Sequence, residues 1–479
     1  KLIDKGYRVA ICEQVITSEK EIKRNSGPME REVVRILTPG TILEANYFND
    51  SNNNFLCSWN EVAGEQAVSW IDLSTGVFFV EKLDNNISIA FETTLERLSP
   101  RELILPEKMK EKKPIHFKGC VSVQADSMFQ TDICEDRLKS FYKIKSLESF
   151  GLFNRASISV SGAILGYINL TQKGKLPLLK KISEWKTSEV MEIDTSSRNS
   201  LELIKTQTGE KSGSFFNSIN KTVTGGGARL LLERLNGPSL NKSLINQRLD
   251  TVSNFIEAKT LRNNIRDLLR GIPDIERSLT RLQFSRGGPR DILSLKIGCN
   301  KARIILSLIC NHRFKKSSVE INRIQKNLNI ETKFVTKLEQ ALSENPPYFA
   351  RDGNFIKEGF SANLDKIKLI HDKSRDHILL LQKKYIEDTK IQSLKIKYNN
   401  VLGYHVEIRR IHETTIQDKN YFIHRQTTAQ ASRYTTTELA NLEKELMSAG
   451  KRALEIELNI FEELVTECKK YSDELLNVF

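Results

Sequence analysis

Cationic and hydrogen-bonding side chains gather in one stretch of the chain, in a pattern that suits contact with a phosphate backbone. From Arg375 to Arg433 there are eleven Lys or Arg residues and six Asp or Glu residues. Residues 421–433 include two arginines and several Ser, Thr and Gln residues, with no carboxylate. Such side chains bind phosphate oxygens without reading base sequence. The simpler alternative is a solvated surface hairpin, because lysines are normally exposed.

Two amphipathic segments flank this stretch and predict the element that positions it. Apolar positions recur every three or four residues over 364–385 and again over 439–460, which is typical of helices with one buried stripe. Two such stripes around an insert predict an antiparallel coiled pair. Each helix would be about 35–45 Å long at a rise of about 1.5 Å per residue. The insert, about 390–435, would then lie at the far tip of a long arm.

The insert itself changes period. Residues 394–401 and 404–408 alternate with period two around Asn399, Asn400 and Gly403, which predicts a small antiparallel sheet. In that sheet Lys395, Lys397 and Asn399 would share one face.

The whole chain, at 479 residues, is too long for one core, so several domains are expected. Short apolar segments at 7–12 and 30–37 predict the end of a small α/β domain. Strands at 55–59, 67–73, 77–80 and 99–105, with a helix at about 87–98, predict a mixed α/β domain. Helical periodicity dominates from about residue 176. We therefore expect a multidomain α/β plus all-α chain, divided at 1–43, 44–175, 176–372, 373–435 and 436–479.

Composition narrows the class of protein further. The net charge of +13 suggests an anionic partner, most often a nucleic acid. The seven cysteines form no Cys-x-x-Cys pair, which fits a reducing cytosol and argues against a zinc module or a disulfide framework. No apolar run is long enough for a membrane span. We expect a cytoplasmic protein, and because the sequence begins abruptly with Lys1 rather than Met, a fragment.

Catalytic motifs are incomplete. Gly209-Glu-Lys-Ser212 resembles the end of a phosphate-binding loop, but Ile204 stands where the first glycine is needed. Gly225-Gly-Gly227 reads as a helix start capped by Thr224. His412-Glu413 lacks the second histidine of a zinc protease. We predict no catalytic residue, metal site or cofactor in this chain. A metal-dependent nuclease around Asp72 is an alternative, although the spacing supplies no second carboxylate.

Ordered motifs along nearly the whole chain resemble the MutS family of DNA mismatch repair proteins. The match begins with segments similar to the end of the family's mismatch-binding domain and its connector, and it continues through the core, the lever helices and the clamp. The segments are Gly6-Tyr-Arg-Val-Ala-Ile-Cys-Glu-Gln14, Arg31-Glu-Val-Val-Arg-Ile-Leu-Thr-Pro-Gly-Thr41, Asp72-Leu-Ser-Thr-Gly76, Met191 to Leu203, Thr222 to Arg229, Asp274-Ile-Glu-Arg277, Arg286 to Asp291, Ile356 to Phe360, Leu402-Gly-Tyr404, His424-Arg-Gln-Thr427, Arg433-Tyr434 and Glu438-Leu439.

The resemblance implies an RNase H-like connector, a helical core with long antiparallel lever helices, and a small β-rich clamp that grips duplex DNA without reading sequence. It implies recognition of mismatched or looped DNA, a MutL-type partner on the connector, and a homodimer in the full-length family, which is doubtful for this fragment. ATP and Mg would belong to an ATPase domain expected after Phe479. The DNA contacts implied by matching residues are Asn399, Gln426, Thr427, Gln430 and Arg433; charge and alternation add Lys395, Lys397 and Arg425.

The chain departs from the family pattern at three places. Many members carry Lys where this chain has Ala429, and often Asn in place of Gln430, so we expect one phosphate contact of the family to be missing or moved here. The family's Phe-x-Glu wedge would precede Lys1; Phe79-Val-Glu81 fits the bare pattern but lies in a predicted connector strand, where we expect a structural role. The ATPase domain would follow the last residue. A helical scaffold that docks a protein partner is the remaining alternative.

Overall fold

The computed structural model describes residues 2–14, 31–43, 52–83, 87–114, 117–151, 153–174, 179–316, 318–399, 401–417 and 421–478. The chain forms two compact units, which are described separately. The first comprises residues 1–287, 291–335 and 467–479, and the second comprises 288–290 and 336–466.

The first unit begins with a two-stranded antiparallel sheet. Strand β1 (Val9–Gln14) pairs with β2 (Arg31–Leu37), and the register shifts between Ile11 and Cys12. Ile3, Leu37 and Ile42 form a small core beside these strands.

A six-stranded mixed sheet follows, in the order β7-β6-β3-β4-β5-β8. Strands β3 to β5 form an antiparallel meander, whereas β6 is parallel to β3, β7 to β6, and β8 to β5. The turn between β4 and β5 uses Gly76 at φ +74°, a conformation that favours glycine. The strands are β3 Phe55–Val62, β4 Glu65–Asp72, β5 Val77–Leu83, β6 Glu102–Pro106, β7 Cys120–Gln124 and β8 Ser183–Glu184.

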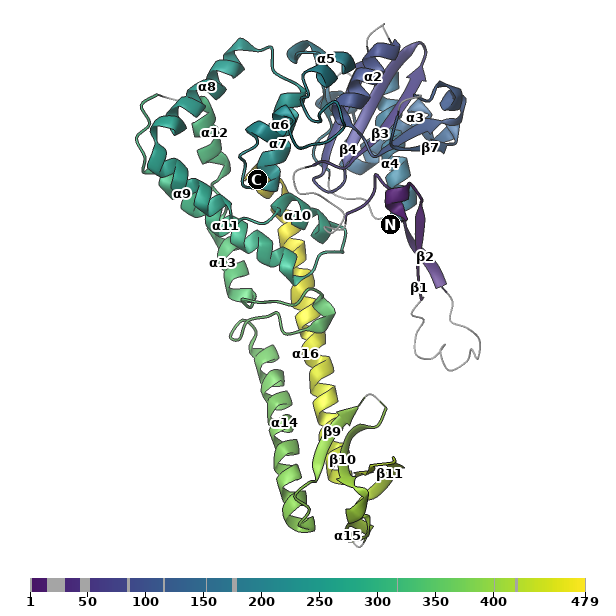
Figure 1. Ribbon diagram of the computed structural model, residues 1–479, viewed down its shortest axis with the longest axis vertical. Coiled ribbons are helices and arrows are strands. Elements are labelled where there is room, and N and C mark those ends of the chain that lie inside the picture. Colours follow the sequence, from purple (N-terminus) through teal and green to yellow (C-terminus); the bar gives the residue numbers. More distant parts are fainter. Residues whose placement is uncertain are drawn as a thin grey trace. The chain divides into compact units, whose positions relative to one another are not determined.

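Both faces of this sheet are buried. Ile104 packs in a core with helix α4 (Arg155–Thr171), whereas its neighbours Leu103 and Leu105 pack with helix α2 (Ile87–Leu98). Figure 1 shows the helices around the sheet. Burial on both faces explains why β6 reads as a continuous apolar run, Leu103-Ile-Leu105, rather than as an alternation.

The remaining helices are short to medium in length, and several begin at the side chains that the sequence suggests. Thr224 caps α7 by accepting a hydrogen bond from the Gly227 N–H at 3.1 Å, as predicted. The helices are α3 Thr131–Tyr142, α5 Thr195–Ser200, α6 Phe215–Ile219, α7 Gly225–Asn236, α8 Lys242–Glu257, α9 Lys259–Leu269, α10 Ile275–Gln283, α11 Pro289–Cys310, α12 Val319–Asn327, α13 Thr332–Ala341 and α17 Ser472–Val478.

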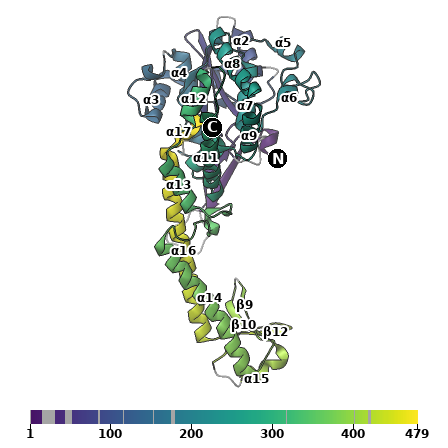
Figure 2. The same cartoon turned by 90° about the vertical axis from the view of Figure 1, so that its left-hand side faces the viewer.

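The second unit contains the predicted arm. Helices α14 (Ala362–Thr389) and α16 (Thr437–Lys470) lie side by side in both views of the molecule (Figures 1 and 2). Each apolar stripe faces the partner helix or the tip sheet, and Leu364 and Leu439 are completely buried.

Side-chain contacts show that the two helices are antiparallel. Lys368 pairs with Glu457 at 2.7 Å, and Lys384 pairs with Glu438 at 3.1 Å. As the residue number rises along α14, the number of the residue that it contacts on α16 falls, so the two helices run in opposite directions. The predicted helical pair is confirmed.

The chain between these helices folds into a four-stranded antiparallel sheet in the order β11-β12-β10-β9, with a short helix α15 (Glu413–Gln417). One face of the sheet packs on the helices, through Val406, Ile408 and Tyr434 against Leu381 and Leu439. The predicted tip sheet is confirmed, and its hairpin residue Asn400 lies outside the described residues. The strands are β9 Lys395–Asn399, β10 Gly403–Arg409, β11 Ile423–Thr427 and β12 Ala431–Thr435.

Two general observations complete the fold. Within the described ranges, no helix has the length and apolar character needed to cross a membrane. All seven cysteines are free thiols, and four of them are buried.

Candidate nucleic-acid interface

The open face of the tip sheet carries a row of polar side chains that crosses all four strands. Lys395 on β9 lies opposite Glu407 on β10, Glu407 lies opposite Arg433 on β12, and Arg433 lies opposite Gln426 on β11. Residues directly opposite each other in antiparallel strands project from the same face. Pairing between strands far apart in the sequence therefore brings four of the predicted or neighbouring residues onto one surface.

Glu407 lies in the middle of this row and joins two cations. Its Oε1 atom accepts from Lys397 Nζ at 2.6 Å, and its Oε2 atom accepts from Arg433 Nε at 3.3 Å. Arg433 also donates to Gln426 Oε1 at 2.9 Å. The hydrogen bond from Lys397, followed by that from Arg433, lowers the pKa of Glu407. The carboxylate is therefore ionised at neutral pH and offsets part of the positive charge of the face.

A β-bulge sets the direction of Arg425. The register of β11 against β12 shifts between His424 and Gln426, which leaves Arg425 as the extra residue. Its side chain is exposed. Bulges commonly redirect a side chain away from the regular alternation, so Arg425 does not follow the strand pattern of its neighbours.

The β11–β12 connection brings the other predicted contacts close together. Thr427 Oγ1 is 2.8 Å from His424 Nε2. The Thr428 hydroxyl donates to the Ala431 carbonyl at 2.8 Å and accepts from the Ala431 N–H at 3.2 Å, which closes the turn. Gln430 lies exposed in this turn beside Ala429.

The Asn399 side chain stabilises the β9–β10 turn. Its Oδ1 atom accepts from the N–H groups of Val401 at 3.0 Å and Leu402 at 2.6 Å. This is the local side-chain-to-backbone bonding typical of asparagine in turns. The turn occupies its carbonyl oxygen, so any contact of Asn399 with a phosphate would use the amide N–H₂ group.

The back of the hairpin is fixed to helix α16. The Tyr404 N–H donates to Glu443 Oε1 at 3.1 Å, and Gly403 has φ +70°. An added Cβ at Gly403 would lie 2.0 Å from the same carboxylate. Glycine is therefore required here both for the backbone conformation and for the close approach of Glu443.

Sequence reasoning missed two residues of the open face. Glu407 was counted among the six acidic residues between Arg375 and Arg433 but was not predicted as a site residue, and neither was Arg409. Both side chains project from the same face of β10. Arg409 is exposed. Period-two alternation from Lys395 could have found both, once β10 was paired with β9.

The alternative site around Asp72 is occupied by structural hydrogen bonds. Asp72 is fully buried; its Oδ2 atom accepts from the Asn54 N–H at 3.0 Å, and Oδ1 accepts from the N–H and hydroxyl of Ser74 at 2.8 and 2.7 Å. Burial raises the pKa of Asp72. In the described part of the chain, no three metal-ligating side chains of the His, Cys, Asp or Glu type lie together. The carboxylate caps a hairpin turn, which does not favour nuclease chemistry.

The Phe79-Val-Glu81 segment is also structural. It lies in β5, and Glu81 forms a buried ion pair with Arg97 and accepts from Thr94 at 3.2 Å. A wedge that inserts into DNA would have to be exposed.

Comparison with known proteins agrees with this architecture. The chain matches the family models for MutS domain I over residues 1–46, MutS domain II over 54–180 and MutS domain III over 196–479. A DNA mismatch repair protein MutS from Ruegeria pomeroyi is 39% identical over 475 residues, covering 97% of this chain and 53% of the relative. Another from Wolbachia pipientis is 36% identical over 507 residues, covering 99% and 59%. The chain thus spans somewhat more than half the length of these relatives, and it belongs to the MutS family.

Proposed function

We propose that this chain holds duplex DNA for mismatch recognition, through non-specific contacts of the tip sheet with the phosphate backbone. The observation that carries the proposal is the row from Lys395 to Gln426 on the open face of a sheet whose other face is anchored to two paired helices. Family membership supports the same role, since both relatives are named DNA mismatch repair proteins.

The chemistry of this face fits a phosphate backbone better than base edges. Cations and amides lie on a sheet, whereas base-specific readout commonly uses a helix or ribbon that enters a groove. Exposed Lys395 and Arg425 are available as cations, and Gln426, Thr427 and Gln430 supply neutral donors. The proposed contacts are Lys395, Lys397, Asn399, Arg425, Gln426, Thr427, Gln430 and Arg433, with Arg409 as an addition.

Fluorescence anisotropy with a labelled duplex tests this proposal. Replacing Arg425 and Arg433 together by Ala should weaken binding about tenfold at low salt, and it should reduce the slope of log affinity against log salt by about two, because each phosphate contact contributes close to one unit. Matched and mismatched duplexes should lose affinity equally.

Lys451 and Arg452 provide the matched control, since both are exposed on α16 away from the tip sheet. Their replacement by Ala removes the same charge and should change affinity less than twofold. A loss confined to mismatched DNA, or an affinity that does not respond to salt, would contradict backbone binding by the tip.

Finer assignments follow from the same family membership. We propose that residues 1–43 belong to the mismatch-binding domain, 44–175 to the connector, 176–372 and 436–479 to the core and levers, and 373–435 to the clamp. A meander followed by parallel strands supports an RNase H-like connector. We also propose that the connector docks a MutL-type partner, that homodimerisation belongs to the full-length family, that the protein is cytoplasmic, and that this chain alone does not hydrolyse ATP.

A further inference from the structure

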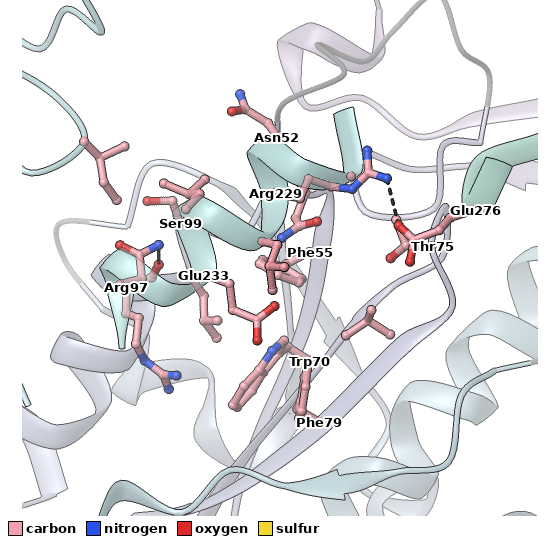
Figure 3. A pocket seen from close by; sticks show the side chains of 18 of the residues that line it. Asn52, Phe55, Trp70, Thr75, Phe79, Arg97, Ser99, Arg229, Glu233 and Glu276 are labelled. Carbon is pink, nitrogen blue, oxygen red and sulfur yellow. Dashed lines mark hydrogen bonds and ion pairs between the residues drawn. The ribbon is translucent and has the colours of Figure 1, made fainter. Parts of the chain in front are cut away.

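A pocket of about 670 Å³ in the first unit has no role in the proposed grip on DNA. It lies between the β3–β5 side of the six-stranded sheet, the end of α2 and helix α7, and Figure 3 shows the side chains that project into it. The volume is within the range of about 300–1,000 Å³ that is usual for small-molecule sites.

One wall of the pocket is aromatic and apolar. Phe55, Trp70 and Phe79 come from three adjacent strands, and Leu230 of α7 also lines the pocket. Leu230 is 46% exposed even though it lies on a helix of the core. An apolar side chain left open to a concave space indicates surface that a ligand could cover.

The cations that line the pocket fall into two groups. Arg97 pairs with the buried Glu81 and stacks on Trp185 at 4.4 Å. Lys180 and Arg229 both pair with Glu276, at 3.0 and 2.8 Å. These charges are therefore compensated within the protein.

The second group is Arg101, Lys205 and Lys211, for which the described residues provide no ion-pair partner. Lys205 and Lys211 flank a turn closed by the Thr206 N–H donating to the Glu210 carbonyl at 2.8 Å, so they emerge from neighbouring positions. Burial, and then the charges of Lys205 and Arg101, lower the pKa of Lys211. Three cations held near one another, none of them in an ion pair with a described residue, favour binding of an anion.

The amino-terminal end of α7 lies on the same pocket. Gly226 and Gly227 line it, and α7 has twelve residues. Helix N-termini favour anions because their first N–H groups have no partner within the helix. Thr75 also lines the pocket near Glu276 (Figure 3), and its buried hydroxyl has no hydrogen-bond partner among the described residues.

Glu233 projects from α7 toward Trp70 (Figure 3). Its carboxyl makes no hydrogen bond or ion pair with another described residue, and burial among the pocket walls raises its pKa. A carboxyl beside an aromatic wall can accept hydrogen bonds from the amino or imino groups of a heteroaromatic ring.

We propose that this pocket binds a nucleoside di- or triphosphate, with the base on the wall formed by Phe55, Phe79 and Leu230, and the phosphates at Arg101, Lys205 and Lys211. Glu233 contacts the edge of the base. Three uncompensated cations and a helix N-terminus fit a polyphosphate better than a single phosphate.

Binding to the full 479-residue chain is measured by isothermal titration calorimetry with ADP and ATP in the absence of DNA, and followed by tryptophan fluorescence. Two of the three tryptophans, Trp70 and Trp185, line the pocket. We expect saturable quenching with a Kd of roughly 10–500 μM, the range of modest ligand affinities. Adenosine and tripolyphosphate should each bind at least tenfold more weakly than ATP.

Three variants locate the site. Lys205→Ala combined with Lys211→Ala should weaken ATP binding at least tenfold, Leu230→Trp should block the base, and Glu233→Gln should change the preference among bases. The control is Lys110→Ala with Lys118→Ala, since both lysines are exposed on the same unit outside the pocket. It should leave binding unchanged.

Several results would overturn the proposal. If tripolyphosphate and ATP bound equally well and Leu230→Trp had no effect, the site would bind anions without recognising a base. Binding of a 5′-phosphorylated dinucleotide but not of ATP would assign the pocket to an oligonucleotide end, whereas retention of full ATP affinity in the double lysine variant would place the ligand elsewhere. None of these measurements depends on whether the tip sheet binds DNA.

Discussion

Asp72 in the six-stranded sheet and Glu407 in the four-stranded sheet are both strand carboxylates, but their surroundings have opposite effects. Asp72 is enclosed on both sides and receives hydrogen bonds from two N–H groups and one hydroxyl, and burial raises its pKa. Glu407 lies on an open face between Lys397 and Arg433, which lower its pKa.

The comparison shows two different roles for a carboxylate: Asp72 stabilises the fold, whereas Glu407 adjusts the net charge of a surface. In a sheet covered on both faces, a carboxylate must find all its partners within the fold, so its removal leaves buried donors unsatisfied. On an open face, solvent can replace lost partners, and the carboxylate changes the charge offered to a ligand instead.

The largest effect should come from Glu102, a second buried carboxylate of the six-stranded sheet. It accepts four hydrogen bonds, and the Glu102→Ala substitution should lower the free energy of unfolding by about 3 kcal/mol or more, because four buried donors lose their acceptor. Urea denaturation followed by tryptophan fluorescence measures this change. The donors are Thr38 Oγ1 at 2.5 Å, Gly40 N at 2.9 Å, Ser122 Oγ at 2.5 Å and Tyr167 OH at 2.6 Å.

Glu65→Ala is the matched control for that substitution. Glu65 is in the same sheet but pairs with Lys82 in an exposed position. Its removal should cost less than about 0.5 kcal/mol. If the two substitutions lowered the free energy of unfolding equally, the distinction between buried and exposed carboxylates would be wrong.

Asp72→Asn should have the next largest effect, about 1–3 kcal/mol, since one buried N–H or hydroxyl donor would face the amide N–H₂ group. The effect should depend on pH. Because the folded pKa of Asp72 is raised, its contribution is fully present below the ordinary aspartate pKa and is lost as pH rises through the folded pKa.

The difference in unfolding free energy between the unsubstituted chain and Asp72→Asn should therefore shrink from pH 4 toward pH 7, as measured by urea titrations at each pH. A difference that grows with pH would mean that the three hydrogen bonds outweigh burial, and that Asp72 behaves like Glu407.

Glu407→Gln should strengthen non-specific DNA binding about two- to fivefold at low salt, since Lys397 and Arg433 would lose their shared countercharge while Gln keeps a hydrogen-bond acceptor. Anisotropy with a labelled duplex measures the change, and Glu455→Gln, exposed on α16, is the control. Weaker binding would show instead that Glu407 positions the two cations.

The smallest effect is expected for the exposed pair between Lys384 and Glu438 on the arm helices. Lys384→Ala should change the free energy of unfolding by about 0.5 kcal/mol or less. A thermal or urea denaturation curve that shifts by more than about 1 kcal/mol would mean that water does not screen open charges on this unit as assumed.

Local patterns predicted much of this fold. The stripes that include Leu364 and Leu439 predicted the two arm helices, because helical periodicity depends on residues three and four apart. Strand alternation predicted β9 and β10, and Thr224 was identified as a helix cap from its neighbours alone. Each of these signals spans only a few residues.

The arrangement of the candidate site could not be predicted in the same way. Glu407 meets Arg433 through the pairing of β10 with β12, which is set by tertiary packing. The bulge at Arg425 depends on the register of a hairpin whose turn was not recognised. The pocket lined by Trp70 and Lys211 likewise combines segments that the sequence separates by more than a hundred residues.

The attachment of the tip sheet to both arm helices has a mechanical consequence. The Ile396 N–H of β9 donates to Gln382 Oε1 on α14 at 2.7 Å, and the Tyr404 N–H of β10 donates to Glu443 Oε1 on α16 at 3.1 Å. A force on the tip sheet is therefore transmitted to α14 and α16 together. The sheet cannot easily bend relative to the two helices. A sideways displacement of the tip sheet should therefore compress one arm helix along its axis and stretch the other.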